Sequence, residues 1–333
     1  MGKQERPPRL DDVATRAGVS TATVSRFFNN PEMVAPETAD RIRKAVEETS
    51  YIPNLVAGGL ASNRTRLVAA LVPEIAHSIF NETMQAMIDE LSDDGLTVML
   101  GLTGYGDERM LKLINAAIGR RVDAIIMTGV LTNPDIRKRL RSQQLTVIET
   151  WGLPPDPIDI AVGFSHRAVG KKIASYVSQR GYKRPYLLTV EGTRAQMRHA
   201  GFIEGWLKAG HNKPTEDLIP YPMHFSQGRD AFRRTRSLSK QPDVIVCGSD
   251  LLAQAVIIEA QAAGCRVPDD LAVIGFGNEV LSAEMRPSIT TVAIDGARIG
   301  RMAVSVLRRR AAGEVLGAKH FDVGFTLIPR ESA

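Results

Sequence analysis

The chain has 333 residues, of which 44% are apolar and 24% charged, a balance typical of a globular protein of about two domains. Its 42 basic and 37 acidic residues leave a net charge of +5, which favours a polyanionic partner only weakly. Two cysteines exclude a disulfide framework, and no apolar run reaches the roughly 20 residues that a membrane span requires. The polar first ten residues carry no secretory signal, so we expect a cytoplasmic protein without a membrane partner.

The first fifty residues predict three short helices. We expect these helices over 10–17, 21–28 and from 36 to about 50. Gly18 permits a tight turn after the first helix, Ser20 is suited to cap the second, and Pro36 stands in the first turn of the third, where a missing N–H costs little.

The spacing of these helices is that of a helix-turn-helix. Val19 and Val24 are expected at the interface between the helices, which leaves one face of the second helix exposed. Such a face fits the major groove of double-stranded DNA, where Arg26 is suited to read guanine. The residues expected at DNA are Ser20, Thr21, Ala22, Thr23, Ser25, Arg26 and Asn29, of which Ser20, Thr23 and Asn29 suit phosphate oxygens. The alternative is a structural three-helix bundle with a solvated Arg26.

Residues 51–66 differ from both neighbouring regions. Asn54 is suited to cap two helical turns over 55–61, but Gly58 and Gly59 each cost about 1 kcal/mol there relative to alanine. A helix this short is marginal alone in water, so we expect it to be ordered only when something holds it.

From residue 67 onward, apolar strands alternate with amphipathic helices. The predicted strands are 67–72, 96–100, 124–127, 146–148, 159–164, 186–188, 244–246 and 271–274. This alternation predicts an α/β core with two open parallel sheets covered by helices. A ligand of such sheets binds at the carboxyl ends of the strands.

The segment from Leu10 through the run at 51–61 closely resembles the lactose-repressor family of bacterial transcription regulators, and the later part resembles that family's periplasmic-binding-protein-like core. The resemblance implies that Thr21, Ala22 and Arg26 read bases. It also implies a hinge helix that contacts the operator. Its expected DNA-binding residues are Asn54, Ala57 and Leu60, and Leu60 wedges into the minor groove.

The implied organisation has three parts. Residues 1–50 form the helix-turn-helix domain, 51–66 the hinge and linker, and 67–333 the core for effector binding and dimerisation. Within the core we expect an N-subdomain of about 67–162 and 294–322 and a C-subdomain of about 163–293 and 323–333.

Polar and aromatic residues that follow the predicted strands are candidates for the effector site. They are His77, Phe80, Glu149, Trp151, His166, Arg194, Gln196, Arg198, Ser249, Asp250, Phe276 and Asn278. Arg198 matches the family's effector-binding arginine, whereas Gly277 stands where many members carry an acidic residue. That departure favours an anionic effector, for which Arg194, Arg198 and His166 would supply positive charge. Each candidate has a structural alternative, such as an N-cap at Asp250 or plain core packing at Trp151.

The segments 159–164 and 322–327 look like those of gluconate-utilisation repressors, which implies a sugar acid as effector. The expected protein is a homodimeric repressor that leaves a near-palindromic operator when the effector binds. A solute-binding protein and an α/β enzyme acting on a sugar acid are the alternatives; the first needs export and the second a nucleophile or base spacing that the sequence lacks. No metal or other cofactor is expected, because the six histidines and two cysteines lack ligand spacing.

Overall fold

The computed structural model describes residues 6–53, 65–75 and 78–333. The chain divides into two compact units, Met1–Arg66 and Leu67–Ala333. The hinge residues Asn54, Ala57 and Leu60 and the pocket candidate His77 lie outside the described residues.

The first unit is helical and has its own small core. Its helices are α1 (Leu10–Ala17), α2 (Thr21–Asn29), the 3-10 turn η1 (Pro31–Met33) and α3 (Pro36–Thr49). Val13, Val24 and Ile42, one from each α-helix, are fully buried against one another. Gly18 ends α1 in the left-handed conformation with φ of 65°, which glycine adopts without steric cost.

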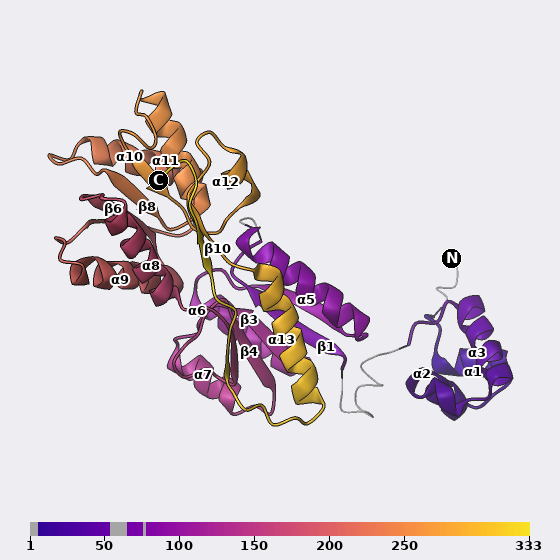
Figure 1. Cartoon of the computed structure of the whole chain (residues 1–333). Coiled ribbons are helices and arrows are strands. Elements are labelled where there is room, and N and C mark those ends of the chain that lie inside the picture. The colour runs from indigo at the N-terminus through magenta and orange to yellow at the C-terminus, as the bar shows by residue number, and fades with distance from the viewer. Residues whose placement is uncertain (1–5, 54–64, 76–77) are drawn as a thin grey trace. The chain divides into compact units, whose positions relative to one another are not determined.

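The second unit holds two parallel sheets, which confirms the predicted fold class (Figure 1). The first sheet has the order β11-β5-β4-β3-β1-β2 and the second the order β7-β6-β8-β9. The strands of the first sheet are β1 (Leu67–Val72), β2 (Thr97–Leu102), β3 (Ala124–Thr128), β4 (Thr146–Thr150), β5 (Ile160–Gly163) and β11 (His320–Asp322). Those of the second are β6 (Pro185–Val190), β7 (Thr215–Ile219), β8 (Val244–Cys247) and β9 (Ala272–Ile274). An antiparallel pair, β10 (Thr291–Ala293) and β12 (Thr326–Ile328), completes the strands.

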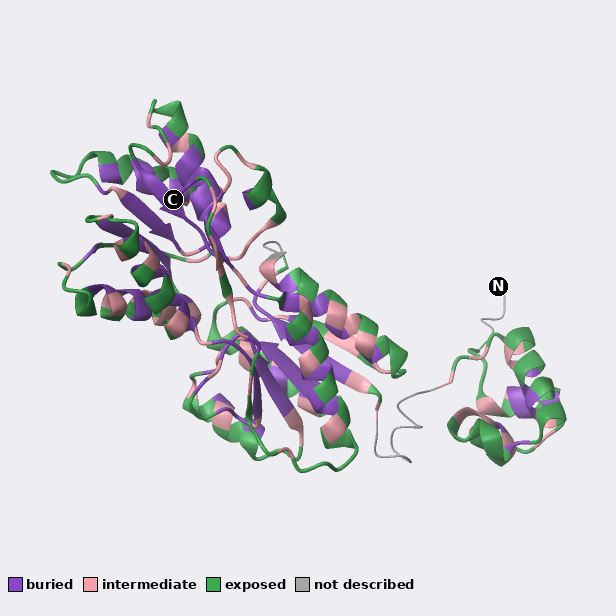
Figure 2. Ribbon diagram, in the orientation of Figure 1, coloured by how far each residue is buried: buried purple, intermediate pink, exposed green. Residues whose placement is uncertain are grey.

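Helices cover both sheets, and their outer faces are exposed while the central strands are buried (Figure 2). The helices whose chain positions fall among the strands of the first sheet are η2 (Ser78–Phe80), α5 (Asn81–Asp93), α6 (Asp107–Gly119), α7 (Pro134–Arg141) and α13 (Gly296–Ala311). The others are α8 (His166–Gln179), α9 (Thr193–Lys208), α10 (Phe225–Arg236), α11 (Asp250–Ala262) and α12 (Val280–Glu284). None of the described helices is long and apolar enough to cross a membrane.

Glycines let two helix pairs approach closely. A Cβ on Gly170 of α8 would lie 1.9 Å from the Arg198 carbonyl oxygen of α9, and one on Gly201 of α9 would lie 2.2 Å from the Arg167 carbonyl oxygen of α8. A Cβ on Gly300 of α13 would lie 2.5 Å from a backbone oxygen of α5. The position of α9, which carries two of the candidate arginines, therefore depends on a glycine contact with α8.

The chain passes repeatedly between the two sheets. β5 of the first sheet is followed by β6 of the second, and after β9 the chain returns to supply β11 to the first sheet. The largest cluster of buried apolar residues includes strands of both sheets, for example Val68 of β1 and Leu187 of β6. The first sheet is therefore built from two separate stretches of chain, whereas the four strands of the second follow one another along the chain.

Four strands were not predicted, namely β7, β10, β11 and β12. β7 and β11 are edge strands with exposed positions, so they lack the continuous apolar run of the buried strands. β10, β11 and β12 have three residues each, too few to show a period in the sequence.

Candidate functional site

The exposed face of α2 carries the residues expected at DNA. Thr21, Ala22, Arg26 and Asn29 are exposed, while Val24 on the opposite face is buried in the core. The side chain of Arg26 makes no ion pair or hydrogen bond with any described residue. An unpaired guanidinium on an exposed helix face is suited to bind a base edge.

Short side chains fix the start and end of α2. Ser20 caps the helix, its Oγ accepting from the Thr23 amide at 3.1 Å, and Asn29 Nδ2 donates to the Ser25 carbonyl oxygen at 2.9 Å. The cap leaves the first-turn amides at an exposed end of the helix, where they suit a phosphate oxygen.

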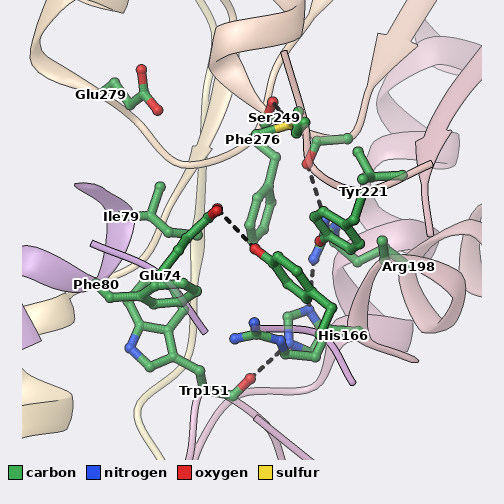
Figure 3. Close-up of a pocket in the computed structure, with 16 residues that line it drawn as sticks. Glu74, Ile79, Phe80, Trp151, His166, Arg198, Tyr221, Ser249, Phe276 and Glu279 are labelled. Atoms are coloured by element: carbon green, nitrogen blue, oxygen red, sulfur yellow. Dashed lines mark hydrogen bonds between the residues drawn. The ribbon is translucent and has the colours of Figure 1, made fainter. Parts of the chain in front are cut away.

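A pocket lies in the second unit, among loops that follow strands of both sheets (Figure 3). Its volume is about 60 Å³. The lining residues are Glu74, Ile79, Phe80, Tyr105, Trp151, His166, Val190, Arg194, Ala195, Arg198, Tyr221, Met223, Gly248, Ser249, Phe276 and Glu279. Its position at the carboxyl ends of parallel strands is the one expected for a ligand site.

Arg198 of α9 is held from three sides. Its Nη1 lies 3.1 Å from His166 Nδ1, its Nη2 donates to the Gly248 carbonyl oxygen at 3.0 Å, and its guanidinium lies 3.8 Å from the centre of the Phe276 ring. No described carboxylate forms an ion pair with it. Burial and the neighbouring Arg194 lower the pKa of Arg198 to about 9, so the guanidinium is still charged at neutral pH.

His166 is a neutral hydrogen-bond acceptor for Arg198. Its Nε2 lies 2.8 Å from the Trp151 carbonyl oxygen and must donate there, which leaves Nδ1 to accept from Arg198. Burial and the two nearby arginines hold the pKa of His166 well below its usual value. The expectation that His166 supplies positive charge was therefore wrong.

Arg194 lies one helical turn before Arg198 on α9. Its guanidinium is 4.9 Å from the centre of the Phe80 ring, and its donors find no acceptor among the described residues. Burial lowers the pKa of Arg194. The charge of Glu74, which also lines the pocket, acts on Arg194 and raises its pKa, but neither guanidinium forms an ion pair with a described carboxylate. A bound anion would supply that partner.

Seven of the predicted effector residues line this pocket. They are Phe80, Trp151, His166, Arg194, Arg198, Ser249 and Phe276. Trp151 Nε1 donates to Thr83 Oγ1 at 2.9 Å, and the Trp151 ring packs edge-on against Phe80 at 5.0 Å.

Four predicted residues do not line the pocket. The fully buried carboxylate of Glu149 accepts from the amides of Leu131 and Ile158, and Asp250 accepts from Thr291, Ser282 and the Glu279 amide. Asn278 accepts from Arg330, and Gln196 is exposed on α9. Glu149, Asp250 and Asn278 therefore fix loops around the site.

The sequence prediction missed other lining residues, among them Glu74, Tyr105, Tyr221 and Glu279. The first three follow β1, β2 and β7, so the carboxyl-end rule applies to them as well. Tyr221 was missed because β7 was not predicted. Among the described residues, no group of three or more histidine, cysteine or acidic side chains is arranged to hold a metal ion.

Comparisons with known proteins agree with this architecture. Residues 9–54 match the model for bacterial regulatory proteins of the lacI family, and residues 174–333 match the periplasmic binding protein-like domain. The HTH-type transcriptional regulator GntR of Pseudomonas aeruginosa PAO1 is 31% identical, with 98% of this chain and 95% of the relative covered. GntR of Escherichia coli K12 is 29% identical, with 98% of both chains covered.

Solved structures extend the likeness to three dimensions. A LacI-family regulator from Silicibacter pomeroyi superposes with a TM-score of 0.91 at 26% identity, over 98% of this chain and 99% of that one. The lac repressor dimer bound to operator superposes with a TM-score of 0.87 at 21% identity, over 98% and 99% of the two chains, and shows the same fold. The chain therefore belongs to the LacI family of bacterial regulatory proteins and is a DNA-binding transcriptional regulator rather than an enzyme.

Proposed function

We propose that this protein represses genes of carbohydrate or sugar-acid catabolism and leaves its operator when a small sugar acid, such as gluconate, binds in the pocket. Residues 1–50 would bind operator half-sites, 51–66 would form the hinge, and 67–333 would bind effector and dimerise. The observation that carries the effector class is the pair of half-buried arginines of the pocket, Arg194 and Arg198, which have no carboxylate ion-pair partner among the described residues.

An anion is the ligand that this arrangement favours. A buried guanidinium costs free energy unless it is paired, and a carboxylate pairs with it through strong, charge-assisted hydrogen bonds. Aromatic rings at Phe80 and Phe276 fix the two guanidinium groups from one side. The likeness of 159–164 and 322–327 to gluconate-utilisation repressors supports a sugar acid as the anion.

Calorimetry tests the effector class. We expect gluconate to bind the full-length protein and glucose, which has the same carbon skeleton without the charge, to bind at least tenfold more weakly. Arg194→Ala should lose gluconate binding, whereas Arg229→Ala, an exposed arginine of α10 paired with Glu259, should retain it. Equal binding of the neutral sugar would reject an anionic effector.

A gel-shift titration with upstream DNA tests the regulatory half of the proposal. Gluconate should release the wild-type protein, and Arg198→Ala should bind the DNA but not respond. If the fraction of shifted DNA does not change when gluconate is added, the effector does not release the protein from DNA. If no upstream fragment gives a sequence-selective shift, the regulatory half of the proposal is rejected.

A further inference from the structure

Two tyrosines stack across the mouth of the pocket. Tyr105 lies in the loop after β2 of the first sheet and Tyr221 in the loop after β7 of the second. Their ring centres are 3.5 Å apart and their planes differ by 8°. The stack therefore joins the carboxyl ends of the two sheets directly over the pocket.

Glu74 holds one of these rings in place. The Tyr105 hydroxyl donates to Glu74 Oε1 at 2.8 Å, and Glu74 follows β1 in the same sheet as β2 (Figure 3). Burial, Tyr221 and Glu74 all raise the pKa of Tyr105, so its hydroxyl remains a proton donor. The ring of Tyr105 is thereby fixed on the side of the first sheet, where it meets Tyr221.

The volume of the pocket requires some lining residue to move. About 60 Å³ is far below the roughly 150 Å³ of a cavity that holds benzene, and a six-carbon acid is larger than benzene. Trp151 and His166 are 2% and 3% exposed and bonded to each other, so the floor of the pocket is rigid. Tyr105, by contrast, is 43% exposed, and the stack on Tyr221 and the hydrogen bond to Glu74 hold it in place.

We propose that Tyr105 and Tyr221 form a gate whose closed stack competes with the effector, so that a ligand enters only by parting the two rings. The gate sets both the affinity for the acid and the size of acid that is accepted. This inference concerns the pocket of the proposed function and rests on that function for the choice of ligand.

Calorimetry with gluconate measures the competition. Loss of one ring removes a stack that typically changes an equilibrium about two- to tenfold, so Tyr105→Ala should bind gluconate tighter by that factor. Tyr105→Phe, which keeps the ring, should give no such gain. The double variant Tyr105→Ala/Tyr221→Ala should gain no more than the single one, because one ring alone cannot stack. Weaker binding by Tyr105→Ala would overturn the gate, since the ring would then be a ligand contact.

A distance measurement tests the gate without any ligand. Spin labels at Lys112→Cys on α6 and Lys240→Cys before β8 report the separation of the sheets, with Cys265→Ser removing the partly exposed native thiol. Tyr105→Ala should lengthen or broaden the distance distribution relative to Tyr105→Phe. Identical distributions overturn the gate. If gluconate binds none of the variants, the proposed effector is wrong. The distances between the spin labels then test the gate without it.

Discussion

Arg26 is exposed on α2 and unpaired with any described side chain, as a base-reading residue must be before it meets DNA. We expect Arg26→Ala to weaken operator binding by about 1–3 kcal/mol and to relax preference at one base pair in each half-site. A quantitative gel shift against single-base operator variants measures both effects. If Arg26→Ala weakens binding to scrambled DNA by the same factor, Arg26 contacts only phosphate.

His166 gives a pH-dependent stability whose sign follows from its environment. Because its pKa in the folded protein lies well below the usual 6.5, the unfolded chain takes up a proton first as the pH falls. The free energy of unfolding contributed by this group is therefore retained above about pH 6.5 and lost on acidification, at up to about 1.4 kcal/mol per pH unit.

The matched variant is His166→Asn, whose amide oxygen still accepts from Arg198 but which does not titrate. Urea unfolding at pH 7 and pH 5.5, followed by tryptophan fluorescence, should show a smaller loss of stability for the variant than for the wild type. Both proteins carry the same carboxylates, so the difference isolates His166. Parallel losses would contradict a buried neutral histidine.

At the scale of elements, the crossing of α8 and α9 positions the pocket. Gly170→Ala places a methyl group against the backbone of α9, so α9 must shift together with Arg194 and Arg198. We expect a loss of about 1–3 kcal/mol in stability and weaker gluconate binding. Gly119→Ala, at the end of α6 with no heavy atom within 4 Å of the new methyl, should be neutral or stabilising by at most about 1 kcal/mol. Equal behaviour of the two variants would show that the glycine contact does not position α9.

Elements with a strong local signal could be predicted from the sequence. The caps at Ser20 and Gly18 and the apolar runs of the central strands predicted α1, α2, β1 and β3 almost to the residue. Edge strands such as β7 are half solvated and charged, so their sequence does not differ from that of a loop.

A residue of the site could be predicted only where the strand that precedes it could be predicted. The rule that ligands lie at the carboxyl ends of strands predicted Trp151 and Arg198 at the pocket, but it does not tell which way a side chain points. Glu149 and Asp250 also follow or end strands, yet backbone amides and hydroxyls bind their carboxylates inside the protein. The direction of such a side chain is decided by hydrogen-bond partners that are far apart in the chain. No local sequence pattern encodes those partners.

At the scale of the whole molecule, the proposed homodimer needs an apolar face. Val280 and Leu281 of α12 are 86% and 56% exposed, and Ile258 of α11 is 45% exposed. In a two-fold dimer the same patch meets itself, so a single new charge is placed twice in the interface.

Val280→Asp should therefore weaken the dimer at least tenfold in analytical ultracentrifugation and reduce operator binding at low protein concentration. Val315→Asp is the matched control, because Val315 is 90% exposed but lies outside this patch. If both variants sediment as the wild type does, α12 is not part of the dimer face.

The repeated passage of the chain between the sheets has a genetic consequence. β11 comes after α13 and completes an edge of the first sheet, and Ser332, near the end of the chain, bonds the backbone of Val273 in β9 of the second sheet. A stop codon or frameshift that falls just beyond α13 thus removes an edge strand from the first sheet and the chain end that bonds to the second. In a genetic selection for loss of repression, nonsense mutations just beyond α13 should therefore give the same complete loss of function as nonsense mutations early in the gene.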